Sequence, residues 1–212
     1  MGEGLVESMV SRMDGSSAGR AWRVAIAFEG ALLVVAYLGG VLLGVPFMDR
    51  WDWSWEAVGW GVLACIPLWG VFYESVHNES KSLREIRRFM DQNIRPLFER
   101  WSTWQLALLS VMAGLGEELL FRGFIQRGLE NWGSLTAGLV ISSVLFGLAH
   151  AMTKAYLLLG ILAGFFFGGI YVMTGNLLIP IITHSVYDFV ALLYYLRKTT
   201  SLEELTEGDE WE

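Results

Sequence analysis

Seven ionisable side chains lie inside apolar stretches of this 212-residue chain. A charge within a hydrophobic segment costs several kcal/mol, and such groups usually mark a functional site. The seven are Glu29, Glu117, Glu118, Arg122, His150, His184 and Asp188. Carboxylates and imidazoles are the groups that most often move protons in general acid–base catalysis. The sequence therefore suggests proton-transfer chemistry in an apolar environment.

The segment from 116 to 122 reads Gly-Glu-Glu-Leu-Leu-Phe-Arg. On a helix Glu118 and Arg122 face one another, because they are four residues apart, and they can form a charge-assisted pair. Glu117 points about 100° away from that partner. It is therefore free to act as a base in a different environment. In the alternative interpretation, all three groups only hold helices together.

His184 and Asp188 are also four residues apart on one helix face. An acidic partner would set the imidazole tautomer, or both side chains would point into one cavity. His150 ends a separate apolar segment, where a single His often has a structural role. In straight helices Glu117 and His150 lie about 21 and 25 Å from the turn at Asn131–Gly133, and His184 and Asp188 lie about 12 and 18 Å from the turn at Gly175-Asn176. Tilt or a break near Gly147 would be needed to bring them together.

The elements that carry these residues are six apolar runs of about the length that crosses a bilayer, 17–25 residues. They are Val24–Val45, Ala57–Tyr73, Trp104 to about Glu130, Gly133–Met152, Tyr156–Thr174 and Leu177–Leu196. We expect an all-α fold, a polytopic membrane helix bundle of about six transmembrane helices plus one interfacial amphipathic helix.

The composition agrees with a membrane protein and excludes several other classes. The chain is 54% hydrophobic and 17% charged, against about 45–50% and 25% in soluble domains. A net charge of −7 without a basic stripe argues against nucleic-acid binding. The single cysteine, Cys65, excludes a disulfide framework and a cysteine-based zinc site.

The chain divides into three parts. Residues 1–103 hold two predicted transmembrane helices and an amphipathic connector. Residues 104–198 hold four helices and every ionisable group named above except Glu29. Residues 199–212 form an acidic tail that we expect to be solvated and partly disordered.

Two further patterns concern packing. Between Leu83 and Trp101, apolar residues recur at helical spacing among basic ones, which predicts a helix on the inner membrane surface, bent near Pro96. This helix is either a simple connector or part of substrate capture.

Gly160, Gly164 and Gly168 share one helix face and predict close packing within the bundle rather than a dimer interface.

Lys and Arg residues predict the orientation, because they are enriched on the cytoplasmic side. With the N-terminus inside, the outer segments hold only Arg50, Arg122 and Arg127. The inner segments hold the other twelve: Arg12, Arg20, Arg23, Lys81, Arg84, Arg87, Arg88, Arg95, Arg100, Lys154, Arg197 and Lys198. We expect an integral protein of the cytoplasmic membrane with both termini cytoplasmic.

Three motifs, taken in order, resemble the CAAX-protease and bacteriocin-processing (Abi, or CPBP) family of intramembrane proteases. The family pattern is Glu-Glu-x-x-x-Arg, then Phe-x-x-x-His, then His-x-x-x-Asn or Asp. The matching residues are Glu117, Glu118 and Arg122, then Phe146 and His150, then His184 and Asp188. The resemblance covers about Leu106–Leu196.

The resemblance implies an intramembrane endopeptidase in which Glu117 and His150 activate a water for attack on a peptide bond. It implies that His184 and Asp188 bind the developing oxyanion, while Glu118 and Arg122 support the site. An ionised Asp188 would repel an oxyanion, so this residue would have to be protonated or would instead orient His184. The implied partners are a peptide or protein substrate, which can be membrane-anchored, and the lipid bilayer. The oligomeric state stays open.

The metal requirement and two other functions also stay open. Glu117, His150 and His184 would be the ligand set for Zn²⁺, whereas resemblance to the eukaryotic prenyl-protein protease favours a glutamate base without metal. A non-catalytic membrane partner protein is one alternative function. A small proton-coupled transporter is the other, although the two halves of the chain show no matching repeats.

Overall fold

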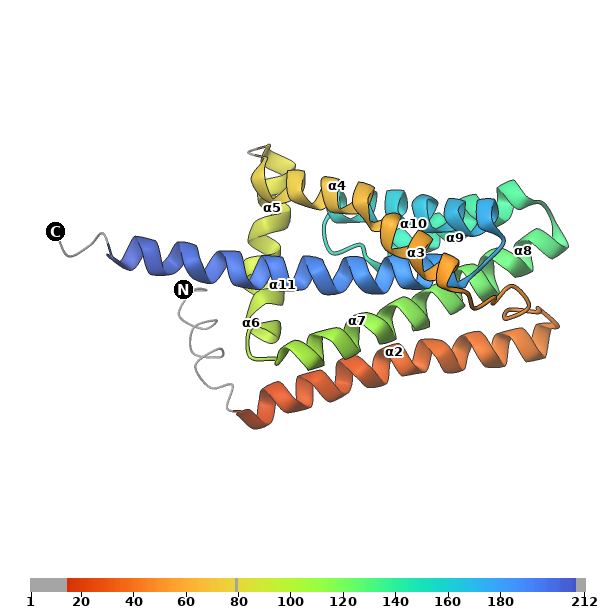
Figure 1. Cartoon of the computed structure of the whole chain (residues 1–212), viewed down its shortest axis with the longest axis horizontal. Coiled ribbons are helices and arrows are strands. Elements are labelled where there is room, and N and C mark those ends of the chain that lie inside the picture. The colour runs from red at the N-terminus through yellow and green to blue at the C-terminus, as the bar shows by residue number, and fades with distance from the viewer. Residues whose placement is uncertain (1–14, 79, 209–212) are drawn as a thin grey trace.

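The computed structural model describes residues 15–78 and 80–208, and within these ranges it contains helices and no strand. Most helices run along the long axis of a bundle (Figure 1). The elements are α2 (Gly15–Leu43), α3 (Trp55–Leu63), α4 (Cys65–His77), α5 (Lys81–Phe89), the π-helix η1 (Met90–Ile94), α6 (Arg95–Phe98), α7 (Thr103–Glu118), the π-helix η2 (Leu119–Gln126), α8 (Arg127–Trp132), α9 (Leu135–Ala149), α10 (Lys154–Thr174) and α11 (Leu178–Gly208).

Six helical passes correspond to the six predicted runs. Among the described residues, four helices are long and apolar enough to cross a membrane: Ala18–Leu43, Trp55–His77, Lys154–Thr174 and Leu178–Arg197. A fifth pass, from Thr103 to Trp132, is continuous through α7, η2 and α8 and carries the charged motif. The all-α membrane bundle is therefore confirmed.

The sixth pass, α9, is shorter than the predicted Gly133–Met152. It has 15 residues, begins after the N-cap Ser134 and ends at Ala149. At 1.5 Å per residue this is about 22 Å, less than the roughly 30 Å of a bilayer core. The helix therefore ends within the depth of the bilayer, and His150 follows directly at its end.

The predicted amphipathic segment is helical and lies across one end of the bundle. Figure 1 shows α5 and α6 running roughly at right angles to the other helices, at the end where α2 begins and α11 finishes. The segment changes to a π-helix at Met90 and then to α6, which has Pro96 in its first turn. Just beyond it, the buried Trp101 donates a hydrogen bond from Nε1 to the carbonyl of Ala18, at 3.2 Å. This contact ties the crossing segment to α2.

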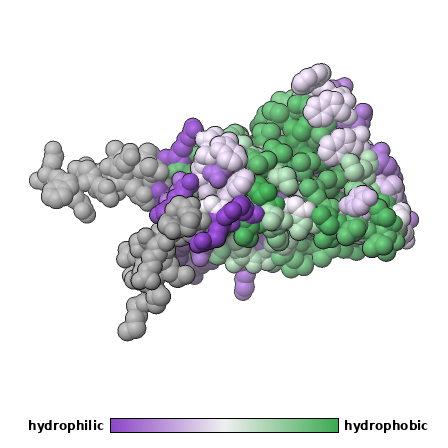
Figure 2. Space-filling model, turned by 90° about the horizontal axis from the view of Figure 1, so that it is seen from below, coloured by the Kyte–Doolittle hydropathy of each residue, from purple (hydrophilic) through white to green (hydrophobic). Residues whose placement is uncertain are grey.

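The surface between the two ends of the bundle is largely apolar. In Figure 2 hydrophobic residues cover most of the visible face, and hydrophilic ones gather toward its two ends. Phe28, Leu42 and Met173 are among many large apolar side chains that are mostly exposed. Such a continuous apolar belt is the surface that a bilayer covers. The protein is therefore an integral membrane protein.

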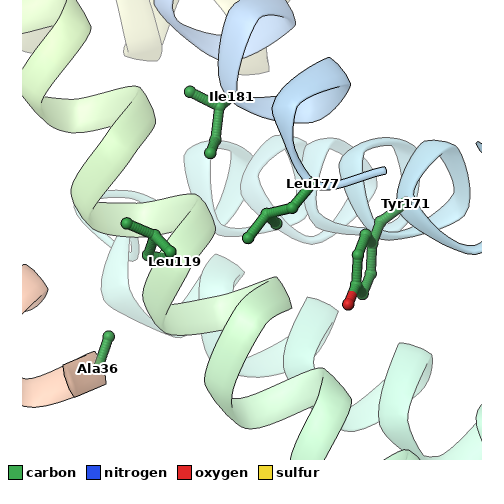
Figure 3. Close-up of a cluster of buried hydrophobic side chains, with 5 residues drawn as sticks. All are labelled: Ala36, Leu119, Tyr171, Leu177 and Ile181. Carbon is green, nitrogen blue, oxygen red and sulfur yellow. The ribbon is translucent and has the colours of Figure 1, made fainter. Parts of the chain in front are cut away.

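Near the charged motif, a buried cluster joins α2 to the helices of the second half of the chain. Figure 3 shows Ala36 of α2, Leu119 of η2, Tyr171 of α10, Leu177 just before α11 and Ile181 in the first turn of α11. Leu119 directly follows Glu118, so this cluster holds the helix that carries the motif. Packing on α2, α10 and α11 thus sets the position of the charged residues.

The glycine stripe of α10 packs against α9 within the same chain, as predicted. A Cβ atom at Gly164 would lie 2.8 Å from the Cα of Ser143, and one at Gly160 would lie 3.2 Å from the Cβ of His150. The two backbones therefore approach as closely as only small residues permit. This approach positions His150.

The remaining acidic tail is only partly described. The backbone of residues 199–208 continues α11, where the sequence predicts a solvated and partly disordered tail. Residues 209–212 lie outside the described residues.

Candidate active site

Glu118 is the centre of a buried ionic network. Its Oε2 lies 3.2 Å from Nε of Arg122, and both side chains have no exposed surface. Its Oε1 lies 3.0 Å from Nδ1 of His184 on α11. Arg122 also donates from Nη2 to the carbonyl of Gly164 on α10, at 2.9 Å. The network thus connects the helix of the first motif to α10 and α11.

The contact between Glu118 and His184 depends on close packing of α7 against α11. A side chain at Gly114 would collide with Ser185 and lie 2.9 Å from the carbonyl oxygen of Ile181. Glu118 lies one helical turn beyond Gly114, on the same face of α7. A glycine at 114 therefore allows the carboxylate of Glu118 to reach the imidazole of His184.

Both ring nitrogens of His184 have a carboxylate within reach. Nε2 lies 3.4 Å from Oδ2 of Asp188, one turn further along α11. The ring of Phe167 stacks on the imidazole, with centroids 4.8 Å apart and planes at 11°. The imidazole therefore has one defined orientation. In this arrangement Asp188 contacts His184 as an orienting partner would, while the oxyanion role of the pair stays a prediction.

His150 faces Glu117 from the end of α9. Its Nδ1 lies 2.8 Å from the carbonyl oxygen of Phe146. A carbonyl oxygen only accepts hydrogen bonds, so Nδ1 carries the hydrogen. In the neutral ring, Nε2 then presents its lone pair, and it lies 3.5 Å from Oε2 of Glu117. The pair can therefore share one proton.

The Phe-x-x-x-His motif has a local explanation in this geometry. The carbonyl of Phe146 is near the end of α9, where helix carbonyls lack intrahelical partners, and it accepts from the imidazole. The aromatic ring of Phe146 also stacks on His150, at 4.6 Å between centroids. It lies 4.6 Å from the guanidinium carbon of Arg122 as well. One residue thus supports both His150 and the buried network.

A cavity of about 790 Å³ separates the predicted residues into two groups. Glu117, His150 and Asp188 line it, together with apolar side chains from α2, α4, α7, α10 and α11 and from the crossing segment. Glu118, Arg122 and His184 are absent from its lining and lie behind the wall. Of the residues to which the resemblance assigns a role, Glu117, His150 and Asp188 can therefore touch a bound substrate.

The donor set does not fit the tetrahedral zinc site that the resemblance raises. Among residues 15–78 and 80–208, no group of three or more His, Cys, Asp or Glu side chains is placed to hold a metal ion. Each nitrogen of His184 already faces a carboxylate, whereas a metal ligand needs a free lone pair. His184 is therefore not available as a third ligand beside Glu117 and His150.

Sequence reasoning placed Glu29 in a span but assigned it no role. In the structure it lines the same cavity as Glu117. The signal was present in the sequence as a lone carboxylate in an apolar run. Its position opposite α7 depends on tertiary packing, which the spacing of residues within one helix does not reveal.

The π-helix η2 was not predicted either. It begins directly after Glu118 and extends to Gln126. Wider helical turns of this kind are rare and often occur at functional sites. Apolar periodicity along the chain gives no signal for one additional residue in a turn.

Comparison with known proteins confirms the resemblance drawn from the three motifs. Residues 99–190 match the sequence model of a family described as type II CAAX prenyl endopeptidase Rce1-like. The uncharacterized protein YpbD of Bacillus subtilis (strain 168) is 30% identical over 97 residues, which are 45% of this chain and 48% of that protein. The chain thus spans about half the length of this curated relative. No solved structure matches.

Proposed function

We propose, from the similarity of residues 99–190 to type II CAAX prenyl endopeptidases, that this protein is an intramembrane endopeptidase. The observation that carries the proposal is the pair formed by Glu117 and His150. Its facing atoms are 3.5 Å apart at the wall of the cavity. The neighbouring Glu118 is occupied by Arg122 and His184, so it is not available as a base.

In the proposed reaction a water in the cavity loses a proton to Glu117 while its oxygen adds to the carbonyl carbon of the peptide. His150 accepts or shares that proton through Nε2. The proton is then delivered to the nitrogen of the leaving amine, and the C–N bond breaks. The products are a new carboxyl end and a new amino end, so the water is fully accounted for. Such general-base assistance contributes about 10²–10⁴-fold in enzymes.

The buried network has a supporting part in this proposal. Glu118 and Arg122 hold η2 against α10, and His184 holds Asp188 at the cavity wall. Asp188 is an orienting partner of His184 rather than an oxyanion donor, because its ionised form would repel the oxyanion. This assignment departs from the role that the resemblance implies for Asp188.

The substrate that we propose is a peptide held at or in the membrane. The cavity wall is mostly apolar, and Ile86 and Met90 of the crossing segment contribute to it. An apolar cavity below an interfacial helix suits a segment that enters from the bilayer rather than from water. The crossing segment is then part of substrate capture, one of the two roles left open by its sequence.

The proposed location is the cytoplasmic membrane with both termini inside. The inner predominance of Lys and Arg supports this orientation. Reporter fusions at Thr199 and at Asp49 should therefore report opposite compartments. The same compartment for both fusions would contradict the arrangement.

The central test is a cleavage assay with the purified full-length protein in detergent. Wild type, Glu117→Gln and Glu56→Gln would be compared on a library of peptides with and without a prenyl group. Glu56 is an exposed carboxylate at the start of α3 and serves as the matched control. We expect cleavage by wild type and Glu56→Gln, and a loss of at least about 10²-fold in Glu117→Gln. Cleavage by Glu117→Gln at the wild-type rate would remove Glu117 from the mechanism, and no cleavage by wild type would favour a non-catalytic membrane partner.

A further inference from the structure

Glu29 is a buried carboxylate on α2, a helix that has many exposed apolar side chains. It is the only acidic residue of α2 and is 9% exposed, whereas the adjacent Phe28 is 61% exposed. The helix lies outside residues 99–190, the part of the chain that matches the peptidase family. The reaction described above gives Glu29 no task.

Close packing of α2 on α7 brings Glu29 beside the first motif. A Cβ atom at Gly116 would lie 2.8 Å from the carbonyl oxygen of Glu29 and 3.4 Å from its Oε2. The glycine that precedes Glu117 therefore leaves room for this carboxylate. Both Glu29 and Glu117 line the cavity, so they approach it from two neighbouring helices.

Glu29 has a buried carboxylate oxygen that can accept a hydrogen bond. Its Oε2 is buried and has no hydrogen-bond partner among the described residues, and the same holds for Oε2 of Glu117. Leaving a buried acceptor unsatisfied costs about 1–3 kcal/mol, and more for a charged group. A residue that only joined α2 to α7 would be expected to have a partner on α7. The partner of Oε2 of Glu29 is therefore better explained as a hydrogen-bond donor that enters the cavity.

The cavity lining limits which donor this is. Among the described residues, its acidic and imidazole groups are Glu29, Glu117, His150 and Asp188. Its side-chain donors include Arg87, Tyr156 and Tyr187, and none of them donates to Oε2 of Glu29. A buried water needs two to four polar partners, and here Glu29 and Glu117 each offer an Oε2 atom without a hydrogen-bond partner among the described residues. Oε2 of Glu117 also lies 3.5 Å from Nε2 of His150. A water has two hydrogens and can donate one to each. Its lone pairs are then left to face the cavity, where a substrate carbonyl would lie.

We propose that Glu29 binds the attacking water together with Glu117 and so orients it toward the scissile carbonyl. This inference rests on the peptidase function proposed above. Glu117 takes the proton that leaves the water, while the second hydrogen stays on the attacking oxygen and is hydrogen-bonded to Glu29. No bond to Glu29 forms or breaks. The peptidase site therefore extends to the first transmembrane helix.

The test uses two substitutions of Glu29 in the purified full-length protein. Glu29→Leu removes the acceptor, and Glu29→Gln keeps one acceptor oxygen at nearly the same shape. Val34→Leu is the matched control, since Val34 is an exposed residue further along α2. The substrate is the peptide that wild type cleaves fastest in the library described above.

We expect kcat to fall by about 10–100-fold in Glu29→Leu, because a poorly oriented nucleophile costs a factor of this order. KM should change little, since the residue binds water rather than the peptide. Glu29→Gln should keep more activity than Glu29→Leu, and Val34→Leu should match wild type. The melting temperature of Glu29→Leu should stay close to that of wild type, because Oε2 of Glu29 has no hydrogen-bond partner on another helix to lose. The solvent deuterium isotope effect on kcat should rise, since water attack becomes more strongly rate-limiting.

The outcomes distinguish this inference from the function on which it rests. If Glu117→Gln is inactive while Glu29→Leu keeps the wild-type kcat, the water-binding role is wrong and the peptidase survives. A lower melting temperature with an unchanged isotope effect would assign Glu29 to packing and also overturn the role. If wild type shows no cleavage that depends on Glu117, the function fails and this inference fails with it. Should Glu29→Leu not fold, kcat and the isotope effect of Glu29→Gln decide in the same way.

Discussion

Glu117 and Glu118 are consecutive residues with opposite environments. Glu118 has no exposed surface, and its two oxygens face Arg122 and His184. Glu117 lines the cavity, and its closest ionic contact is His150, at 3.5 Å. A rotation of about 100° along one helix is enough to separate the two surroundings. The same type of side chain thus supports structure at one position and is placed for chemistry at the next.

The largest effects should come from the cavity side. Glu117→Gln and His150→Ala should each lower the cleavage rate by about 10²–10⁴-fold, the usual contribution of a general base. The double variant should lose little more than either single one, because residues that act as a unit are not additive. Cleavage rates of the four proteins, with melting temperatures as the control for folding, measure this. Losses that multiply in the double variant would show that the two residues act separately.

Substitutions in the buried network should lower the stability of the fold rather than act on the chemical step. Removing one partner of a buried ion pair typically costs about 3–5 kcal/mol. Glu118→Ala should be more destabilising than Arg122→Ala, because it removes the carboxylate that pairs with Arg122 and one of the two carboxylates that contact His184. Changing Glu118 and Arg122 together to leucine should cost less than the sum of the single losses. Unfolding in detergent measures these differences.

The exposed ion pair between Asp49 and Arg127 provides the control for this prediction. Its atoms are 2.9 Å apart, but its side chains are 37% and 17% exposed. Asp49→Ala should therefore cost less than about 1 kcal/mol. Equal losses at Asp49 and Glu118 would show that burial does not separate the two ion pairs.

A smaller effect is expected from the helix packing that connects the two sides. In Gly164→Ala the new methyl group would meet the backbone of Ser143 at 2.8 Å, and overpacking of this kind costs about 1–3 kcal/mol. Gly169→Ala on the same helix adds a methyl group with no other atom within 4 Å. It should be neutral or stabilise by up to about 1 kcal/mol, since alanine favours helix. Equal melting temperatures of the two variants would contradict the close approach of α9 and α10.

Contacts within a helix were predictable, and contacts between helices were not. Spacing alone gave the pairs Glu118–Arg122 and His184–Asp188, because residues four apart on a helix are neighbours. The contacts of Glu117 with His150 and of Glu118 with His184 depend on how the helices cross. The depths calculated along straight helices did not bring Glu117, His150, His184 and Asp188 into mutual contact. The structure forms two separate groups of contacts, one buried and one at the cavity.

Two local features explain why the depths calculated along straight helices did not predict the contact between Glu117 and His150. The helix α9 ends at Ala149, three residues before the predicted boundary at Met152. The chain then leaves the helix at His150, which allows its ring to turn toward Glu117. The π-helix after Glu118 also changes which side chains share a face. Neither an early helix end nor a π-helix has a periodic signature in an apolar sequence.

The smallest effect is expected from metal removal. This experiment tests whether His184 of the buried group acts together with Glu117 and His150 of the cavity group. A zinc mechanism would need His184 as a ligand beside Glu117 and His150, so it would join the buried group to the cavity group. In the structure the nitrogens of His184 face Glu118 and Asp188, at 3.0 and 3.4 Å. We therefore expect a chelator to leave the cleavage rate and the melting temperature unchanged. Loss of activity with chelator and its recovery with zinc, measured on the same preparation, would mean that His184 turns away from these carboxylates in the active protein.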